Sequence, residues 1–552
     1  MKPSRIHVLL LAATALFLLG LFSTELADPD AWWHLATGRY IATHHRLPIP
    51  DPFAYTTALA PPSTPAEART ERFNLTHEWL AQLIWYAIEA LGGFGAVVFW
   101  KALLLAVMCA LSGYTAWRRT QSTLWAVAAA LMAASLAIEF AHDRPSILTY
   151  VFTALFLAIW EDGRRLWLLP PLALLWANCH GGFFVGWIVC GVYTAAALLR
   201  RAPAARRFLT ITALTVVISA INPNGFASIA TVLAYRASPM QATLIEWSRA
   251  DLWGPPYAFD LLLYASAIVL LLAWRRVRLA DWLLFAAFAA ASLTAFRNEM
   301  LLGILAPILI ATYFPRLRLR LPEPATQYAA IAILVAATGY GAARGAFFQL
   351  RAAEWRYPAG AAAFLHDHVP AARIFNTYEY GGYLIWRGIP VFIDGRALRE
   401  SVFDDYRKII GTPAGSLLRR DAFARYGVNA IVVNAFEYNA GALYSLVPAL
   451  SSPAEAEWKL VYEDPQSLVF LHDPPPGMPV LDTRRIVDHL ESECRLHIER
   501  DPAFPLCART LGDLFLRSGD RTRARRSLAL YLEHPIADDP AARRAYQQLL
   551  QP

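Results

Sequence analysis

The side chains best suited to chemistry in this 552-residue sequence are carboxylates that follow its first apolar stretch. Asp28 and Asp30 are separated only by Pro29, and Glu78 follows His77 further along. A carboxylate can accept the proton of a hydroxyl group or bind a divalent cation. His77-Glu78 also begins the zinc-protease pattern HExxH, but Ala81 replaces its second histidine, so that pattern is incomplete.

Further ionisable groups stand between the later apolar stretches of the chain. Arginine suits phosphate binding because its guanidinium group presents several donors in a fixed plane. A histidine beside two glycines, as at Cys179-His180-Gly-Gly, marks a place where a helix can break and expose backbone donors. The groups of this kind are Glu139, Asp143 and Arg144; His180; Glu246; and Arg297 with Glu299.

The composition shows what kind of elements must position these groups. Hydrophobic residues make up 57% of the chain and charged residues 17%, and the mean hydropathy is +0.35. Soluble proteins average about 45–50% apolar and about 25% charged residues. These values exclude a disordered chain, a collagen-like repeat and a disulfide-rich module. They predict a polytopic α-helical membrane protein.

The apolar stretches predict about eleven transmembrane helices, since a span needs roughly 20 apolar residues and several of these stretches are shorter. The shorter ones either extend into flanking residues or are broken helices packed inside the bundle. The stretches lie near residues 6–22, 96–117, 121–138, 147–160, 166–178, 183–199, 208–221, 260–274, 279–296, 300–314 and 326–343.

Basic residues predict the orientation of these helices. Every second connection is rich in arginine, and the positive-inside rule places such connections in the cytoplasm. The N-terminus is then cytoplasmic and residues 344–552 lie outside. The net charge of +7 therefore reflects membrane topology and does not indicate nucleic-acid binding. The basic residues are Lys2, Arg5, Arg118, Arg119, Arg164, Arg165, Arg200, Arg201, Arg206, Arg207, Arg275, Arg276, Arg278, Arg316, Arg318 and Arg320.

The other connections hold the unusual polar groups, so these gather at the outer rim of the transmembrane domain, residues 1–343. The first outer loop, residues 24–95, predicts two amphipathic surface helices over 31–44 and 77–91. An aromatic belt at the lipid headgroups is the expected role of Trp32, Trp33, Trp79 and Trp85. One-sided clustering of ionisable groups is the strongest functional signal, because such groups are costly near a membrane core.

Two soluble parts follow the membrane helices. Residues 344–475 predict a small outer α/β domain, with short apolar runs at 373–375, 391–393, 430–433, 459–462 and 468–471. Residues 476–552 predict a helical tail with tetratricopeptide-like spacing, which either binds a protein partner or caps the outer domain. Cys494 and Cys507 are candidates for a disulfide in this oxidising compartment.

Several motifs together resemble one family. DPDAWWHLATGRYI, HEWL, WANCHGGFFVG, INPNGF, and FNTYEYGGYLIW with VFIDGR occur in this order over roughly residues 1–475. They are similar to GT-C membrane glycosyltransferases, and within these to the bacterial group called dolichyl-phosphate-mannose-protein-mannosyltransferase-like. The TYEYG segment is similar to the WWDYG signature of oligosaccharyltransferases, but both tryptophans are absent. We infer only a shared domain type from it.

The resemblance implies an enzyme that moves a sugar from a polyprenyl-phosphate carrier to a glycan, lipid or protein acceptor at the outer membrane face. It implies that Asp30 and Asp28 act either as the catalytic base or as ligands of a divalent cation, Mg²⁺ or Mn²⁺. Glu78 is a further candidate for the second catalytic carboxylate. Many relatives have adjacent acidic residues, whereas this chain has Asp-Pro-Asp. The expected substrate-binding residues are His77, Asp143, Arg144, His180 and Arg297.

Each of these residues also has a structural interpretation. Asp30 and Glu78 can cap helices, Asp143 can pair with Arg144, although the functional interpretation joins Asp143 with Glu139 in a second acidic cluster, and Arg297 can pair with Glu299. Two other functions stay open as well. One is a polysaccharide polymerase or ligase that uses a diphosphate-linked glycan, and the other is a non-catalytic scaffold with a partner-binding tail. A transporter is disfavoured, because transporters place their sites near the membrane midplane.

Overall fold

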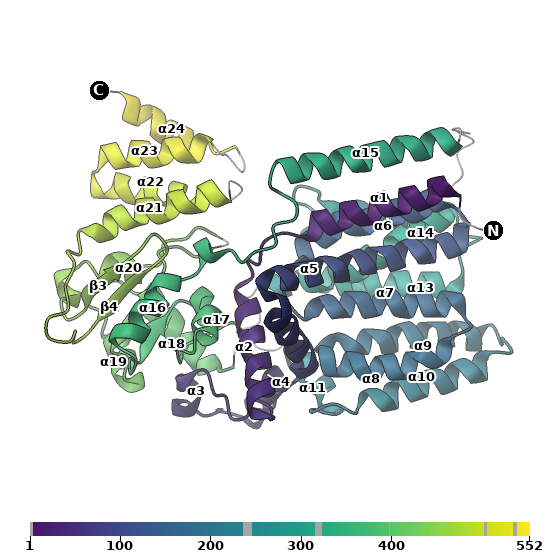
Figure 1. The fold of residues 1–552 in the computed structure, drawn as a ribbon, viewed down its shortest axis with the longest axis horizontal. Coiled ribbons are helices and arrows are strands. Elements are labelled where there is room, and N and C mark those ends of the chain that lie inside the picture. Colours follow the sequence, from purple (N-terminus) through teal and green to yellow (C-terminus); the bar gives the residue numbers. More distant parts are fainter. Residues whose placement is uncertain are drawn as a thin grey trace. The chain divides into compact units, whose positions relative to one another are not determined.

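The computed structural model describes residues 4–235, 245–314, 323–396, 398–438, 440–501, 505–533 and 538–551. Lys2 and the basic residues Arg316, Arg318 and Arg320 lie outside these ranges. The chain is 69% helical and forms two compact units. Unit 1 consists of Met1–Pro48 and Thr64–Ala352, and unit 2 of Ile49–Ser63 and Ala353–Pro552. Figure 1 shows the helices and strands of each unit.

Unit 1 is built entirely from helices among its described residues. Its α-helices are α1 (Arg5–Phe22), α2 (Pro29–His44), α4 (Pro65–Thr76), α5 (Trp79–Thr120), α6 (Thr123–Ala137), α7 (Ser146–Asp162), α8 (Leu169–Cys179), α9 (Phe184–Leu199), α10 (Ala205–Ser219), α11 (Ala227–Tyr235), α12 (Ala258–Leu272), α13 (Leu279–Thr294), α14 (Glu299–Tyr313) and α15 (Glu323–Ala343). Short 3₁₀ turns lie between them: η1 (Ile138–Phe140), η2 (Leu166–Leu168), η3 (Gly181–Phe183), η5 (Ile245–Trp247) and η6 (Phe296–Asn298).

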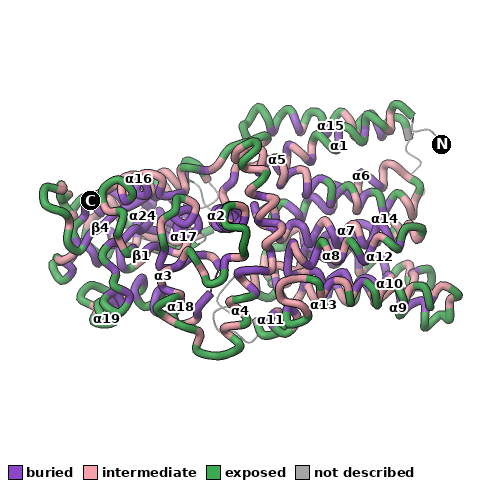
Figure 2. Tube along the Cα trace, turned by 60° about the horizontal axis from the view of Figure 1, so that its bottom comes forward, coloured by how far each residue is buried: buried purple, intermediate pink, exposed green. Residues whose placement is uncertain are grey.

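Four helical segments in the described part of the chain are long and apolar enough to cross a membrane: Arg5–Phe22, Pro65–Thr120, Thr123–Phe140 and Gly181–Leu199. Shorter apolar helices run over Leu166–Cys179, Ala258–Leu272 and Leu279–Thr294. Large apolar side chains on the outside of unit 1 are exposed, as Ile333 and Val335 on α15 show, and Figure 2 shows exposed residues along that helix. The larger number of about eleven spans stays a prediction.

Helix α5 changes course at Gly93, whose φ of 64° is favourable for glycine alone. The break separates residues 79–92 from the apolar residues 94–120, in agreement with the separate segments predicted near 77–91 and 96–117. Gly113 then brings α5 close to α6, because a β-carbon there would lie 2.6 Å from the carbonyl oxygen of Ala126.

The prediction of an aromatic belt is wrong for three of its four tryptophans. Trp32 and Trp85 are only 1% and 0% exposed, and Trp33 is also buried. The reason is that α2 packs tightly on α5: a β-carbon at Gly38 would lie 2.1 Å from a backbone oxygen of α5. Helix α2 is therefore an internal element, whereas the sequence predicted an amphipathic surface helix.

At the end of unit 1 where arginines are frequent, some of them hold helices together. Arg119 of α5 and Arg278, at the start of α13, both pair with Glu161 of α7 and Asp281 of α13. The hydroxyl of Tyr313 also donates to Asp281. These arginines therefore have a packing role in addition to the topological one expected from the sequence.

Unit 2 contains a four-stranded sheet in the order β1-β2-β4-β3. Strands β1 (Ile374–Asn376) and β2 (Ala430–Val433) are parallel, and β4 (Leu468–Leu471) runs antiparallel to β2 and to β3 (Lys459–Glu463). Four of the five predicted runs form these strands. The fifth, at 391–393, forms no strand; Val391 makes only an isolated bridge with Ala54. The helices are α16 (Ala359–His368), α17 (Tyr378–Trp386), α18 (Glu400–Gly411), α19 (Leu417–Tyr426) and α20 (Leu446–Ala449), with the turns η7 (Glu354–Arg356) and η8 (Pro453–Glu455).

Residues 49–63, which the sequence analysis assigned to the first outer loop, belong to unit 2. This segment carries the short helix α3 (Tyr55–Leu59). Asp51 pairs with the buried Arg396, which also pairs with Asp394, and the hydroxyl of Thr56 donates to the carbonyl of Phe392 at 2.7 Å. These long-range contacts were not visible in the spacing of the sequence.

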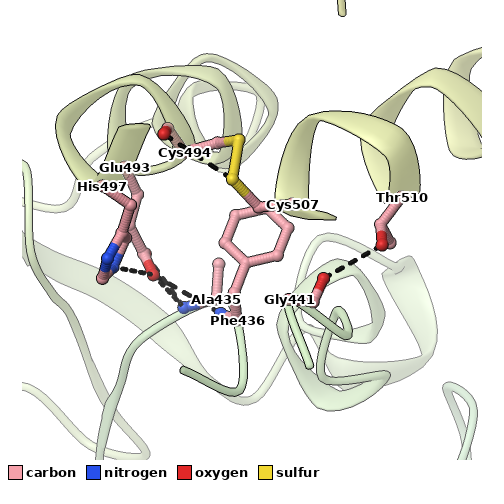
Figure 3. Close-up of a disulfide and its surroundings, with 8 residues drawn as sticks. All are labelled: Ala435, Phe436, Gly441, Glu493, Cys494, His497, Cys507 and Thr510. Atoms are coloured by element: carbon pink, nitrogen blue, oxygen red, sulfur yellow. Dashed lines mark hydrogen bonds and ion pairs between the residues drawn. A yellow bond between two sulfur atoms is a disulfide. The ribbon is translucent and has the colours of Figure 1, made fainter. Parts of the chain in front are cut away.

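The tail forms four helices, α21 (Arg485–Arg500), α22 (Leu506–Ser518), α23 (Arg521–Glu533) and α24 (Pro540–Leu550). Cys494 and Cys507, the two candidates for a disulfide, are bridged and join α21 to α22 (Figure 3). The buried Glu493 accepts hydrogen bonds from the backbone N–H groups of Ala435 and Phe436. Apolar residues of the tail and of the sheet share one hydrophobic core, so the tail caps the α/β fold.

Candidate functional site

Two neighbouring groups of ionisable side chains lie in unit 1. The first, the Arg144 cluster, consists of Asp28, Asp30, His142, Arg144, Glu246 and Arg297. The second, the Glu78 cluster, consists of His34, His77, Glu78 and His180. Helix α2 belongs to both, because it begins after Asp28 and carries His34 one turn after Asp30.

The start of α2 positions the two aspartates differently. Asp28 is the N-cap residue, and its Oδ1 accepts the backbone N–H of Asp30 at 2.9 Å. Pro29 occupies the first helical position, where its lack of an N–H group costs nothing. The cap of this helix is thus Asp28, and the alternative that Asp30 caps it is wrong. The side chain of Asp30 is left for other contacts.

Arg144 connects three carboxylates from distant parts of the chain. Its Nε donates to Oδ2 of Asp28, its Nη1 lies 3.1 Å from Oδ2 of Asp30, and its Nη1 also lies 2.5 Å from Oε1 of Glu246. His142 Nδ1 is 3.8 Å from Asp28 as well. The candidate site residues Asp28, Asp30 and Arg144 are therefore brought together, although 116 positions separate Arg144 from Asp28.

These contacts shift the two aspartate pKa values in opposite directions. Burial raises the pKa of Asp28, but the charges of Arg144 and His142 outweigh it and leave this pKa below its usual range. For Asp30, burial and the negative charge of Asp28 outweigh the opposing effect of Arg144, so its pKa is raised. Asp28 is consequently a fixed anion, whereas Asp30 is the better proton acceptor.

Arg297 completes the Arg144 cluster. Its guanidinium group lies 4.9 Å from the ring centre of Trp247, and its Nη1 is 3.7 Å from Oε2 of Glu246. The predicted pair between Arg297 and Glu299 does not form, because the Glu299 carboxylate accepts the hydroxyl of Tyr257 instead. The sequence indicated Glu246 only as a polar group between two apolar stretches, and its membership of the site was missed.

Asp143 has a different environment from the one predicted. Its carboxylate is buried and lies 3.1 Å from Nζ of Lys101 on α5. The local pair with Arg144 therefore does not form, and Glu139, exposed on η1, is not part of a buried acidic cluster with Asp143. Lys101 was missed, although a single lysine inside an apolar stretch is a signal of a buried ionic partner.

Glu78 precedes α5 but does not cap it with its side chain. Its carboxylate instead faces three imidazoles: His34 Nδ1 at 3.5 Å, His77 Nε2 at 3.5 Å and His180 Nε2 at 3.6 Å. The helix-cap alternative for Glu78 is therefore wrong, and the predicted residues His77, Glu78 and His180 lie together. His34 was missed; its spacing of four from Asp30 on one helix could have indicated it.

Hydrogen bonds orient two of these imidazoles. Nδ1 of His77 lies 2.8 Å from the carbonyl oxygen of Phe73 and donates to it. Nδ1 of His180 accepts the N–H of Gly182 at 3.1 Å, so in the neutral ring Nε2 carries the proton and points toward Glu78. The predicted helix break is present after Cys179, but the Gly182 donor is used by His180 and is not presented to a phosphate.

Among the described residues, no group of three or more His, Cys, Asp or Glu side chains is placed to hold a metal ion. For the Glu78 cluster this agrees with the tautomer of His180, whose protonated Nε2 is not a metal ligand. Burial lowers the pKa of His34 to about 4, with the Glu78 charge opposing this effect. His34 is therefore neutral at physiological pH.

The TYEYG motif lies inside unit 2. Glu379 and Tyr380 of α17 are buried, and Oε1 of Glu379 accepts the hydroxyl of Tyr444 at 2.5 Å. Burial raises the pKa of Glu379 from 4.5 to about 7, with the hydrogen bond from Tyr444 opposing. The motif therefore contributes to the core of unit 2.

We expect this carboxyl group to make stability depend on pH. A folded-state pKa above the unfolded value gives stability that is present below pH 4.5 and is lost as the pH rises through about 7. The free energy of unfolding falls by about 3 kcal/mol in total, since each unit of pKa difference between the folded and unfolded states is equivalent to about 1.36 kcal/mol. Thermal unfolding of the full chain in detergent between pH 5 and 8 measures it. Glu379→Gln should reduce the slope, and Glu354→Gln, an exposed control in the same unit, should not; equal slopes in both variants would contradict the prediction.

Comparison with known proteins adds no further assignment. No protein-family model matches this chain, and no curated protein matches it. The resemblance to GT-C enzymes therefore stays a prediction from short motifs, and the functional argument depends on the geometry of the two clusters.

Proposed function

We propose that this chain is a multi-pass membrane glycosyltransferase of the GT-C type. It would move a sugar from a polyprenyl-phosphate carrier to an acceptor hydroxyl at the outer membrane face. One observation carries the proposal: a proton-accepting carboxylate, Asp30, lies 3.1 Å from the guanidinium group of Arg144 in a partly buried cluster. Such a pair offers a base for the acceptor and a cation for the departing phosphate.

The reaction would be a direct displacement at the anomeric carbon of the donor sugar. The acceptor oxygen forms a bond to this carbon while Asp30 takes the hydroxyl proton. The bond between the anomeric carbon and the phosphate oxygen breaks, and the phosphate leaves with the electron pair. Arg144 and Arg297 would balance the charge that develops on this leaving group.

Asp30 is favoured over Asp28 as the base by both contact and exposure. The two oxygens of Asp28 are engaged, one by the backbone of Asp30 and the other by Arg144. The side chain of Asp30 is 14% exposed, against 3% for Asp28. Asp28 would thus hold Arg144 and the start of α2 in place, while Asp30 meets the acceptor.

The ion pairs of Asp28 and Asp30 with Arg144 also affect whether these aspartates can bind the predicted Mg²⁺ or Mn²⁺. A divalent cation bound by Asp28 and Asp30 would have to displace Arg144 from both carboxylates. Because both carboxylates already pair with Arg144, the site favours arginine over a metal ion as the group that neutralises the phosphate. A cation, where required, would supply further stabilisation of the leaving phosphate.

The proposed topology has about eleven membrane-spanning helices, a cytoplasmic N-terminus and an outer C-terminal part in the bacterial inner membrane. The exposed apolar side chains of α12 and α15 support lipid contact. An outer location of the Arg144 cluster follows from the cytoplasmic assignment of the arginine-rich connections.

The deciding assay supplies the purified protein with a panel of polyprenyl-phosphate sugars and a membrane extract as the acceptor source, with and without divalent cation. Release of carrier phosphate is measured. Loss of a general base typically costs 10²–10⁴-fold, so we expect Asp30→Asn to slow release by about 10²-fold or more. Asp28→Asn should also slow it, because Arg144 loses its anchor.

Glu139→Gln is the matched control, since it removes an exposed carboxylate outside both clusters. Release that continues unchanged in Asp28→Asn and Asp30→Asn would show that the proposed site is wrong. Use of a diphosphate-linked glycan, with no release from any monophosphate carrier, would favour the polymerase or ligase function instead.

A further inference from the structure

Glu246 lies between two arginines. Its Oε1 is 2.5 Å from Nη1 of Arg144, and its Oε2 is 3.7 Å from Nη1 of Arg297. One carboxylate therefore bridges guanidinium groups from the η1–α7 connection and from η6. Two guanidinium groups that face one another across an anion form an arrangement suited to a phosphate group.

Glu246 is the carboxylate of this cluster best placed to leave. Its side chain is 40% exposed, whereas that of Asp28 is 3% exposed and also caps α2. It stands in the short 3₁₀ turn η5, and the residue after this turn, Ser248, accepts a hydrogen bond from the N–H of Phe296 in η6. Rotation of its side chain would free both arginines without disturbing α2.

The two arginines are held in position independently of Glu246. Arg144 keeps its contacts with Asp28 and Asp30, and Arg297 lies against the ring of Trp247. Removal from water raises the pKa of Glu246, but the charges of Arg144 and Arg297 outweigh this effect and leave its pKa lowered. Glu246 is accordingly an anion that competes for the same cations as any bound phosphate.

We propose that Glu246 occupies the phosphate subsite of the ligand-free protein and exchanges with the monoanionic phosphodiester of the donor. The identity of the donor rests on the proposed function, but the exchange itself concerns anion binding alone. Replacing one carboxylate by one singly charged phosphodiester leaves the net charge of the cluster unchanged. A diphosphate would bring at least one additional negative charge beside Asp28 and Asp30, so the subsite favours carriers with one phosphate.

When Glu246 fills the subsite in most molecules, a phosphodiester binds only to the rest. The apparent Kd is then the intrinsic Kd divided by the fraction of molecules in which the subsite is open. If Glu246 fills the subsite in about nine molecules of ten, Glu246→Gln should bind a phosphodiester about tenfold more tightly. Glutamine keeps the size of the side chain and removes its charge. Glu139→Gln serves as the control for the general loss of one negative charge and should bind as the unmodified protein does.

Calorimetric titration of the full chain in a maltoside detergent, free of phospholipid, tests the exchange. The probes are methyl farnesyl phosphate, a monoanionic phosphodiester, and farnesyl diphosphate. Tighter binding of the phosphodiester by Glu246→Gln supports the proposal, and Arg297→Gln in the same background should weaken it again. Equal or weaker binding by a Glu246→Gln protein that melts like the unmodified one would overturn it.

Two further measurements separate this inference from its premise. Competition by phosphatidylglycerol at equal concentration would assign the subsite to a bilayer headgroup and overturn the exchange with a donor. Tighter phosphodiester binding without sugar release in the transfer assay would leave the exchange standing and refute the transferase. Sugar release with unchanged binding in Glu246→Gln would refute only the exchange.

Discussion

Replacing Arg144 by methionine is expected to lower the free energy of unfolding by about 3–5 kcal/mol and to abolish sugar transfer. The stability loss arises because Asp28 would remain buried without its guanidinium partner. The activity loss arises because the charge beside Asp30 and the leaving phosphate disappears. Thermal unfolding and release of carrier phosphate from the same preparation measure the two effects.

A second substitution separates these effects. Asp28→Asn in the Arg144→Met background removes the uncompensated charge and should restore part of the stability without restoring transfer. Arg118→Met is a suitable control, because the pair of Arg118 with Asp162 is more exposed and such pairs contribute about 0–1 kcal/mol. A loss no larger than that of Arg118→Met would show that the Arg144 contacts do not stabilise the fold.

Replacing Lys101 by methionine should have an effect of similar size, with a loss of about 3–5 kcal/mol. The side chains of Lys101 and Asp143 are only 1% and 2% exposed. Nζ of Lys101 also donates to the carbonyl and the hydroxyl of Thr24 at 3.0 and 3.1 Å. The pair thereby joins α5 to the α1–α2 connection and to the η1–α7 connection, and its loss would leave Asp143 as a buried, unpaired charge.

The double variant Lys101→Met with Asp143→Leu checks this reasoning. Replacing both members of a buried ion pair by apolar residues is often neutral or stabilising, so it should melt at a higher temperature than Lys101→Met alone. A double variant that melts as low as the single one would show that the lost stability comes from packing or from Thr24. Transfer activity is then compared only between variants that remain folded.

Much of the local structure could be predicted from the sequence. The apolar stretches predicted helices because hydrophobic side chains must be removed from water, and several helices have the predicted limits within a few residues. Four of the five short runs in unit 2 form strands, and Cys494 and Cys507, candidates for a disulfide by their compartment, are bridged. These signals are carried by neighbouring residues, which is why one sequence suffices to detect them.

The candidate site was only partly predictable. Asp28, Asp30 and Arg144 were each identified by their chemical type, but the contact among them was not, because it depends on how α2 packs beside the η1–α7 connection. Glu246 was not assigned to the site because its role comes from its position between two arginines. His34 was missed because its contact with Glu78 joins α2 to the start of α5.

Hydropathy and residue type therefore determined that this is a helical chain with segments apolar enough to cross a membrane and a polar set of acids, histidines and arginines. Only the tertiary structure decided which charge meets which. It paired Asp143 with Lys101, placed Arg144 among Asp28, Asp30 and Glu246, and buried Trp32 and Trp85 inside the bundle. The physical reason is that a buried charge must find a partner wherever packing brings one, and sequence spacing does not record that distance.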